Sequence, residues 1–276
     1  MSNAPSFQGP DDGSYVLGHV DREVRRLLLQ GRLYDDYTTY VLQLAGLQPG
    51  MRVLDIGCGP GDVSFIASRL VGPTGRVLGV DASSDIIEFA RSRAREHGLN
   101  NVGFEATAIA DVFLDEPVDA VIGRMILMYL PDPVEALRRL ATMVRPGGVI
   151  AFCEVNSAVA GSLPDLPLWR SLVDSVVQAF RNAGCDTTFG VKLDAVFRRA
   201  GLGAPRVRLG AVGGDTDVAI QLAETWRSML PVAERAGLVS EELADLDTLA
   251  QRLLDQAAAA QAITITPALI GAWARV

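Results

Sequence analysis

Cysteine and histidine are scarce in this sequence. Its 276 residues include three cysteines, Cys58, Cys153 and Cys185, and two histidines, His19 and His97. Three scattered cysteines are too few for a disulfide framework, and so few thiols and imidazoles argue against a zinc site. We therefore expect no bound metal, and we expect a reducing compartment, the cytoplasm.

Long hydrophobic runs and a basic charge balance are also missing. The longest apolar stretches have the length of a strand and are interrupted by charges, which predicts no membrane-spanning segment. No basic start followed by an apolar segment indicates a signal peptide. The formal net charge of −8 disfavours nucleic acid and anionic membranes as partners. Short basic clusters such as Arg25-Arg26 are interpreted as solvated helix faces, and a homodimer is left open.

Strand and helix patterns alternate along most of the chain. Strands are predicted, from β-rich or continuous apolar character, at residues 52–56, 76–80, 102–106, 118–123, 149–155, 206–211 and 269–276. Helices are predicted, from apolar residues at three- and four-residue spacing, at residues 20–30, 36–45, 62–71, 83–97, 133–144, 168–183 and 191–200. This alternation predicts an α/β fold, a Rossmann-like, doubly wound, mostly parallel seven-stranded sheet with helical lid elements.

The chain is long enough for one full core with an elaboration. We expect residues 1–46 to form an N-terminal arm and helical cap, and residues 47–212 with 261–276 to form the core. Residues 213–260, with a helical pattern over 218–260, separate the two closing strands, which predicts a lid over the carboxyl edge of the sheet. Five apolar side chains are expected either to line this lid or to pack in its core: Trp169, Phe180, Phe189, Trp226 and Met229.

A glycine-rich turn follows the first predicted strand. Gly57, Gly59 and Gly61 precede a helix, so a ligand can approach bare backbone and the N–H groups of the helix start. Asp81 ends the next strand, where a carboxylate accepts hydrogen bonds from a ribose diol. A tight loop and a helix-capping aspartate are the alternatives. The order strand, glycines, helix, strand and acid favours a nucleoside ligand.

Charges near the turn distinguish between nucleosides. Dinucleotide sites carry a third glycine at the sixth position of their motif, where this sequence has Asp62, whose charge would repel a pyrophosphate. Asp55, two residues before Gly57, adds a second carboxylate at the end of the strand. Carboxylates suit a ligand that bears an ammonium or a sulfonium. These charges favour S-adenosylmethionine over a nicotinamide dinucleotide.

Several segments resemble the motifs of class I S-adenosylmethionine-dependent methyltransferases. They are residues 53–61 (Val-Leu-Asp-Ile-Gly-Cys-Gly-Pro-Gly), 77–83, 119–125 with 130–133, and 140–150, all within 47–155. Residues 15–19 and 271–275 resemble, more loosely, a bacterial and fungal subgroup that often acts in secondary metabolism. The resemblance implies S-adenosylmethionine as cofactor and methyl transfer to an O, N or C atom of a small-molecule acceptor.

The resemblance also implies where each part of the cofactor binds. The implied cofactor-binding residues are Asp55, Gly57, Gly59, Gly61, Asp81, Ala82, Ala108, Ile109, Arg124 and Met125. The glycine turn and the end of the fourth strand would surround the methionine part, with Asp55 near its ammonium and Asp81 at the ribose. The family usually ends its third strand with an acid that binds adenine. Ala108 stands there instead, so the backbone of Ala108 and Ile109, or the side chain of Asp111, would contact adenine.

The family reaction is a direct displacement at the sulfonium methyl, in which the enzyme aligns donor and acceptor and excludes water. A base is needed only for an acceptor that must lose a proton, and the candidate catalytic residues are Glu154, His19 and Tyr15. Alternatively, Glu154 caps a loop or pairs with an arginine, His19 is a surface residue, and Tyr15 covers the cofactor. An apolar lid favours an apolar or aromatic acceptor. The alternative function is a cofactor-binding protein that catalyses another step, such as a cyclisation, or serves as a non-catalytic partner.

Overall fold

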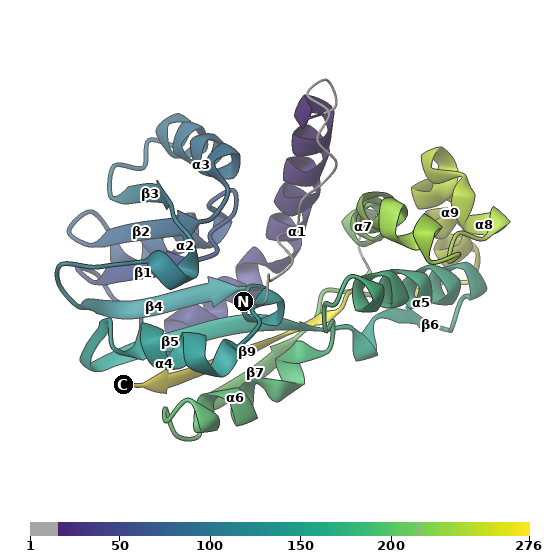
Figure 1. The fold of residues 1–276 in the computed structure, drawn as a ribbon. Coiled ribbons are helices and arrows are strands. Elements are labelled where there is room, and N and C mark those ends of the chain that lie inside the picture. Colours follow the sequence, from purple (N-terminus) through teal and green to yellow (C-terminus); the bar gives the residue numbers. More distant parts are fainter. Residues whose placement is uncertain (1–15, 215) are drawn as a thin grey trace, which may run out of the picture.

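A seven-stranded, mostly parallel sheet forms the centre of the molecule (Figure 1). The computed structural model describes residues 16–214 and 216–276, with side chains from residue 23 onward. The strands of this sheet are β1 (Arg52–Ile56), β2 (Arg76–Asp81), β3 (Val102–Ala106), β4 (Val118–Arg124), β5 (Val144–Asn156), β7 (Arg206–Gly210) and β9 (Ala268–Arg275).

The strand order is β3-β2-β1-β4-β5-β9-β7. The strands from β3 to β5 pair in parallel, and β9 pairs antiparallel with both β5 and β7. The predicted α/β fold with a mostly parallel seven-stranded sheet is therefore confirmed. Because β1, β2 and β4 are parallel neighbours, their carboxyl ends meet at one edge, which is where ligands bind in such sheets.

Helices cover both faces of the sheet (Figure 1). They are α1 (Val16–Ala45), α2 (Asp62–Val71), α3 (Ser84–Glu96), α4 (Pro133–Ala141), α5 (Pro167–Asn182), α6 (Leu193–Arg199), α7 (Thr216–Arg235), α8 (Glu241–Ala244) and α9 (Leu246–Ala259). Successive strand residues point to opposite faces, so Val53 packs in the core with α1 and α2, and Leu54 packs in the core with α4 and α6. Burial on both faces explains the apolar character of central strands such as β4 and β9, whereas the edge strands β3 and β7 are mostly exposed.

A single long helix, α1, takes the place of the two helices predicted over residues 20–30 and 36–45. The predicted break is wrong because Leu33 and Tyr34, between the two segments, are buried and continue the packing. Gly31 lies at the junction, and one glycine costs a helix interior only about 1 kcal/mol. A Cβ on Gly31 would lie 2.8 Å from Oδ2 of Asp62, so this glycine allows α1 to approach the start of α2 closely.

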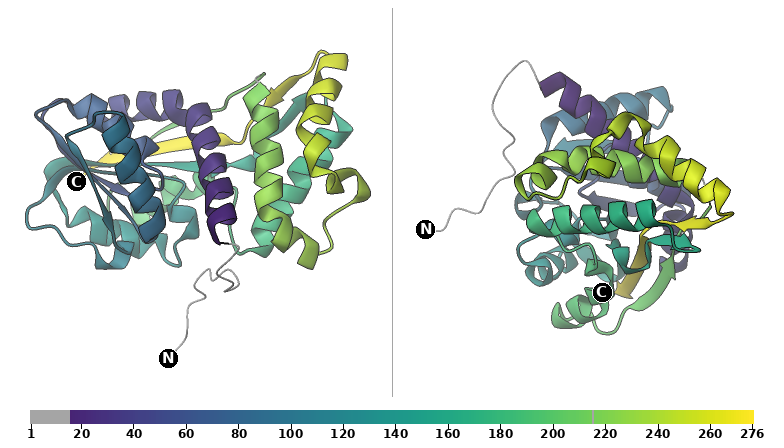
Figure 2. Two further views of the ribbon diagram at one scale, coloured as in Figure 1. Left: turned by 90° about the horizontal axis from the view of Figure 1, so that it is seen from above. Right: turned by 90° about the vertical axis from the view of Figure 1, so that its right-hand side faces the viewer.

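A helical unit lies beyond the carboxyl edge of the sheet (Figures 1 and 2). It contains α5, α7, α8, α9 and a two-stranded sheet of β6 (Gly161–Leu163) and β8 (Ile263–Ile265). Seen from above, α1 stands between the large sheet and α7 (Figure 2). Trp169 and Trp226 are buried in this unit, and their indole N–H groups donate to the carbonyl oxygens of Leu253 (3.1 Å) and Leu243 (3.0 Å).

The five apolar side chains considered for the lid differ in their surroundings. Trp226 and Met229 are buried in the core of the helical unit, and Phe189 is buried against the opposite face of the sheet, so these three pack in cores. Phe180 is partly buried against the same core as Trp226 and Met229, and Trp169 also borders a cavity.

Among the residues that the structure describes, none of the helices has the length and apolar character needed to cross a membrane.

Replacing Trp226 with phenylalanine should lower the free energy of unfolding by about 2 kcal/mol, because it leaves the Leu243 carbonyl unpaired and opens a small void. Thermal or urea unfolding measures the change. Phe180→Leu shortens a side chain that is only partly buried, and it should cost clearly less. Equal costs for the two variants would contradict the packing described for Trp226.

Candidate functional site

A groove of about 280 Å³ lies at the carboxyl edge of the sheet, between α1 and the turn that follows β1. Five of the residues implied by the family resemblance line it together: Gly57, Gly59, Asp81, Arg124 and Met125. The other five lie outside its lining as far as the described residues define it: Asp55, Gly61, Ala82, Ala108 and Ile109. The groove therefore gathers the ends of β1, β2 and β4, which are distant in the sequence.

The glycine turn needs its glycines for two different reasons. Gly57, Gly59 and Gly61 have φ angles of 64°, 51° and 92°, which side chains rarely adopt. A Cβ on Gly57 would lie 2.5 Å from Cδ1 of Ile126, so this position has no space for a side chain. A Cβ on Gly59 would meet no atom within 4 Å in the described part of the chain, so Gly59 presents bare backbone to the groove.

Asp81 is fixed by main-chain donors at the end of β2. Its Oδ2 accepts a hydrogen bond from the N–H of Gly59 (3.1 Å), and its Oδ1 accepts one from the N–H of Ser83 (3.0 Å). The side chain of Ser83, rather than that of Asp81, caps α3 by accepting from the N–H of Ile86. The carboxylate of Asp81 therefore joins the glycine turn to the end of β2 and lines the groove.

Asp55 lies beneath the turn instead of in the groove. It is 1% exposed, and its Oδ2 accepts a hydrogen bond from the Ser64 hydroxyl (2.5 Å). Its Oδ1 is buried and has no hydrogen-bond partner among the described residues. Burial raises the pKa of this carboxyl to about 7. The expected second carboxylate is thus present below the turn, and near neutral pH it is partly protonated.

The charge of Asp62 is balanced within the protein. Its Oδ1 lies 2.9 Å from Nη2 of Arg93, and both side chains are largely buried. The guanidinium of Arg93 also lies 5.0 Å from the ring centroid of Phe65. Asp62 is therefore not the unpaired charge that was expected to repel a pyrophosphate. Arg93 pairs with it, and the sequence pattern did not show this distant arginine.

The end of β4 carries an unusual backbone conformation. Met125 has φ 52°, in the left-handed region that costs a non-glycine residue about 1–2 kcal/mol. Its N–H donates to the Cys153 carbonyl (2.8 Å). Arg124 donates from Nη1 to Asp35 (3.0 Å) and Thr38 (3.0 Å), both on α1. The strained turn thus borders the groove, and Arg124 joins β4 to α1.

Glu154 supports this same turn from below. Its side chain is fully buried on β5, and Oε1 accepts hydrogen bonds from the N–H groups of Ile126 (3.0 Å) and Leu127 (2.8 Å). Its Oε2 is buried without a hydrogen-bond partner in the ranges that the structure covers. Burial raises the pKa of Glu154 to about 7. This geometry is that of the loop-capping alternative, since Glu154 is not part of the groove lining.

The segment expected at adenine is held by an arginine on α4. Arg139 donates to the carbonyl oxygens of Ile109 and Val112. Ala108 precedes the short helix Ile109–Asp111 and is exposed, as is Asp111. The backbone contact to adenine stays a prediction.

The other two catalytic candidates are not placed by side-chain geometry. Tyr15 lies outside the described residues, and His19 falls in α1 where only the backbone is described. Their roles stay predictions. No group of three or more His, Cys, Asp or Glu side chains that could hold a metal ion occurs within the residues searched, which are those the structure describes.

One face of α1 supplies groove residues that the sequence analysis missed. Glu23, Arg26, Leu27 and Gln30 recur at three- and four-residue spacing and line the groove, together with Tyr129 after β4. Arg26 is 12% exposed and donates to Glu23 (2.6 and 2.9 Å) and Gln30 (3.0 Å). Its assignment to a solvated helix face is therefore wrong. The spacing was visible in the sequence, but the direction of that face was not.

Alanine at Gly57 and at Gly59 should have different consequences. Gly57→Ala forces a Cβ against Ile126, which is expected to lower the free energy of unfolding by about 1–3 kcal/mol. Gly59→Ala adds only backbone strain of about 1 kcal/mol but places a methyl group in the groove, so it should weaken ligand binding more than folding. Urea unfolding and calorimetric titration separate the two effects, and identical behaviour of both variants would contradict the geometry of the turn.

A family model described as a methyltransferase domain matches residues 47–200. The chain belongs to this methyltransferase family. The matched residues include the whole of β1 to β5, with the glycine turn, Asp81 and the turn after β4. Every described groove residue outside α1 therefore lies within the methyltransferase domain.

Individual relatives agree with the family assignment. The aklanonic acid methyltransferase of Streptomyces sp. (strain C5) is 43% identical over 121 residues, which are 43% of this chain and 54% of that protein. The chain spans about half the length of the first curated relatives that it matches.

Solved structures share the fold. A putative methyltransferase from Bacillus halodurans C-125 has a TM-score of 0.57 at 15% identity, covering 86% of this chain and 97% of that one. The [4+2]-cyclase SpnF has a TM-score of 0.52 at 20% identity, covering 88% and 82%. At these identities the likeness establishes the methyltransferase fold alone.

Proposed function

We propose that this methyltransferase-family chain binds S-adenosylmethionine in the groove and transfers its methyl group to an O, N or C atom of a small apolar or aromatic metabolite. The observation that carries the proposal is the meeting of the Gly59 backbone, the fixed carboxylate of Asp81 and the guanidinium groups of Arg26 and Arg124 around one groove.

The residues present fit this cofactor. Open space at the Gly59 Cβ position leaves room for close approach to the turn. The groove holds charges of both signs, and the methionine part of the cofactor carries both a carboxylate and an ammonium. Asp81 would accept the ribose hydroxyls, while Arg26 and Arg124 would bind the carboxylate. Asp55, beneath the turn, would add negative potential on the side of the ammonium.

The chain's contribution to the reaction would be alignment and exclusion of water. When bound, the cofactor supplies a methyl group on a positively charged sulfur, which is already electrophilic. Alignment of a nucleophile with such a group can supply much of the rate enhancement, and exclusion of water from the reacting groups prevents its competing attack. Because Glu154 lies beneath the turn after β4, we assign it to support of that turn, and no proton transfer by it is required for an acceptor that is already nucleophilic.

Two measurements test the proposal. Calorimetric titration of the full chain should show binding of S-adenosylmethionine and S-adenosylhomocysteine, and much weaker binding of NAD. Incubation with methyl-labelled cofactor and a metabolite extract should then produce a labelled small molecule. Tighter binding of NAD than of either sulfur compound would overturn the cofactor assignment.

The alternative is a cofactor-dependent step without methyl transfer, because the same fold occurs in a [4+2]-cyclase. Cofactor binding without any labelled product, combined with consumption of an unlabelled metabolite into an isomer, would favour that alternative. Appearance of the methyl label in the metabolite product favours methyl transfer.

We also propose a cytoplasmic location, a small-molecule acceptor as the main partner, and a division into residues 1–46, the core and residues 213–260, with the correction that α5, β6 and β8 pack with the helices of residues 213–260. The net charge of −8 and the three unpaired cysteines support the first two. Limited proteolysis tests the division, since cleavage should concentrate at its boundaries.

A further inference from the structure

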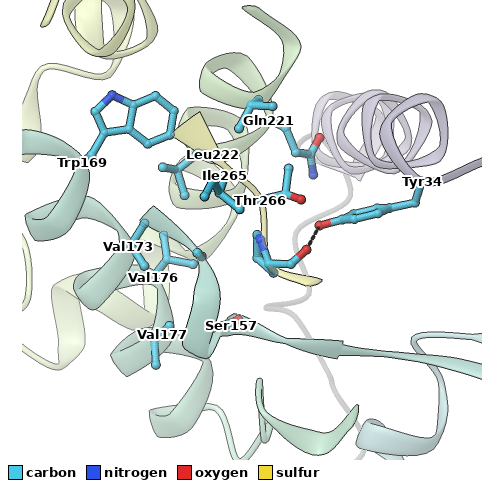
Figure 3. A pocket seen from close by; sticks show the side chains of 13 residues that line it. Tyr34, Ser157, Trp169, Val173, Val176, Val177, Gln221, Leu222, Ile265 and Thr266 are labelled. Atoms are coloured by element: carbon cyan, nitrogen blue, oxygen red, sulfur yellow. Dashed lines mark hydrogen bonds between the residues drawn. The ribbon is translucent and has the colours of Figure 1, made fainter. Parts of the chain in front are cut away.

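A second, smaller cavity lies among α1, α5 and α7, on the side of the helical unit (Figure 3). Its volume is about 50 Å³. Most of its wall is apolar and comes from Trp169, Val173 and Val176 on α5 and from Val218 and Leu222 on α7. Figure 3 shows Tyr34 reaching toward it from α1, opposite the α5 side chains. The cavity's apolar wall with few polar groups has the lining, but not the size, of a small-molecule site.

The cavity lies close to the groove along α1. Tyr34 borders the cavity, and Gln30, four residues earlier on the same face of the helix, lines the groove. Four residues advance a helix by about 6 Å. Ser157 also borders the cavity and directly follows β5 at the carboxyl edge. A molecule in the cavity would therefore lie about one helical turn beyond the groove.

One buried polar atom at this cavity has no hydrogen-bond partner among the described residues. Gln221 on α7 borders the cavity, and its Oε1 is buried with no hydrogen-bond partner in the described part of the molecule. The Thr225 hydroxyl donates its hydrogen to the Gln221 carbonyl (2.8 Å), so its oxygen can only accept from the Gln221 side-chain amide (3.4 Å). This sets the amide orientation, with Oε1 as the free acceptor. Figure 3 shows the amide of Gln221 extending toward Tyr34.

The neighbouring polar groups are already engaged. The Tyr34 hydroxyl donates to the Pro267 carbonyl (2.8 Å), and the Thr266 hydroxyl oxygen accepts from the N–H of Val212 (3.1 Å). Gln221 Oε1 is therefore the buried acceptor at this cavity that has no partner among the described residues. Sites that contain a buried polar group discriminate strongly against ligands that leave that group unpaired.

We propose that this cavity binds the methyl acceptor and that Gln221 selects acceptors carrying a hydroxyl group on an apolar ring. The inference rests on the proposed function, because the acceptor bound in the cavity would be the second substrate of the reaction in the groove. An apolar cavity of about 150 Å³ admits benzene, so a cavity of about 50 Å³ must widen to take a ring, and the proposal includes an outward movement of α7 from α5. The contacts of Val218 and Leu222 with α5 are apolar and non-directional, which permits such a movement.

Phenol and anisole are matched probes, because anisole has the same ring and oxygen but no hydroxyl hydrogen. The full chain, saturated with S-adenosylhomocysteine, is titrated with each compound by ligand-observed NMR. We expect phenol to bind at least tenfold more tightly than anisole. Gln221→Leu should abolish that difference, whereas Gln178→Leu, at a half-buried position on α5 that does not line the cavity, should leave it unchanged.

Further measurements keep the outcomes distinct. Val176→Phe fills the cavity and should remove phenol binding without changing the affinity for S-adenosylhomocysteine. If Gln221→Leu does not fold, Gln221→Met, of similar length, replaces it. Equal affinities for phenol and anisole, or displacement of phenol by S-adenosylhomocysteine, would overturn the inference while leaving the proposed function intact. A chain that binds no S-adenosylhomocysteine at all would instead overturn the proposed function.

Discussion

Replacing Asp81 with asparagine is expected to raise the dissociation constant for S-adenosylmethionine at least tenfold, which corresponds to about 1.4 kcal/mol or more. Hydrogen bonds to a charged group contribute about 1.5–3 kcal/mol, and the carboxylate would accept such bonds from the ribose. Asparagine has the same shape, and its single carbonyl oxygen can keep one of the two main-chain hydrogen bonds that Asp81 now accepts from Gly59 and Ser83. Calorimetric titration measures the loss.

The control for this variant is Asp85→Asn. Asp85 is a nearby aspartate in the first turn of α3, but it is exposed and does not line the groove. It should bind the cofactor as the wild type does. Circular dichroism checks that both variants keep the fold. An affinity within twofold of the wild type for Asp81→Asn would remove Asp81 from the cofactor site.

Local pattern was sufficient to predict most of the sheet and its turns. The helix α2 begins and ends where the sequence predicts, at residues 62 and 71, because glycines at both ends stop it and the apolar residues between them are buried. The strand β3 likewise matches residues 102–106. Such elements are determined mainly by their neighbours in the chain and by which of their residues are buried, and both leave a mark in the residue pattern.

Features that depend on distant contacts could not be predicted in this way. Arg93 neutralises Asp62 from 31 residues away. The burial of Arg26 depends on α1 lying across the turn after β1, and the short strands β6 and β8 pair across about a hundred residues. A hydrophobic pattern indicates which face of a helix is buried, but not which partner it meets. The groove residues of α1 were missed for this reason.

The response of stability to pH tests whether Glu154 is buried beneath the turn after β4 as the structure describes. In the folded chain burial raises its pKa to about 7, whereas in the unfolded chain a glutamate titrates near its ordinary value of about 4.3. Between these values the folded state binds more protons, so the free energy of unfolding falls as the pH rises. The stabilisation is complete below the unfolded pKa and is lost as the pH rises through about 7.

Glu154→Gln should therefore be more stable relative to the wild type at pH 7.5 than at pH 5, because the amide keeps an oxygen for the N–H groups of Ile126 and Leu127 and does not ionise. Urea unfolding at several pH values measures the slope. Asp55, whose pKa burial also raises to about 7, contributes a second slope of the same sign, which Asp55→Asn should remove. Glu135→Gln, at an exposed glutamate of α4, serves as the control.

Glu154→Ala is expected to cost about 3 kcal/mol or more, because it leaves two buried N–H groups without an acceptor and opens a cavity. The same loss should release Met125 from its left-handed conformation, so cofactor affinity should fall together with stability. A base, by contrast, would be revealed by slow methyl transfer in Glu154→Gln with unchanged cofactor affinity. That second pattern would contradict the supporting role, since the support depends on the oxygen and not on the charge.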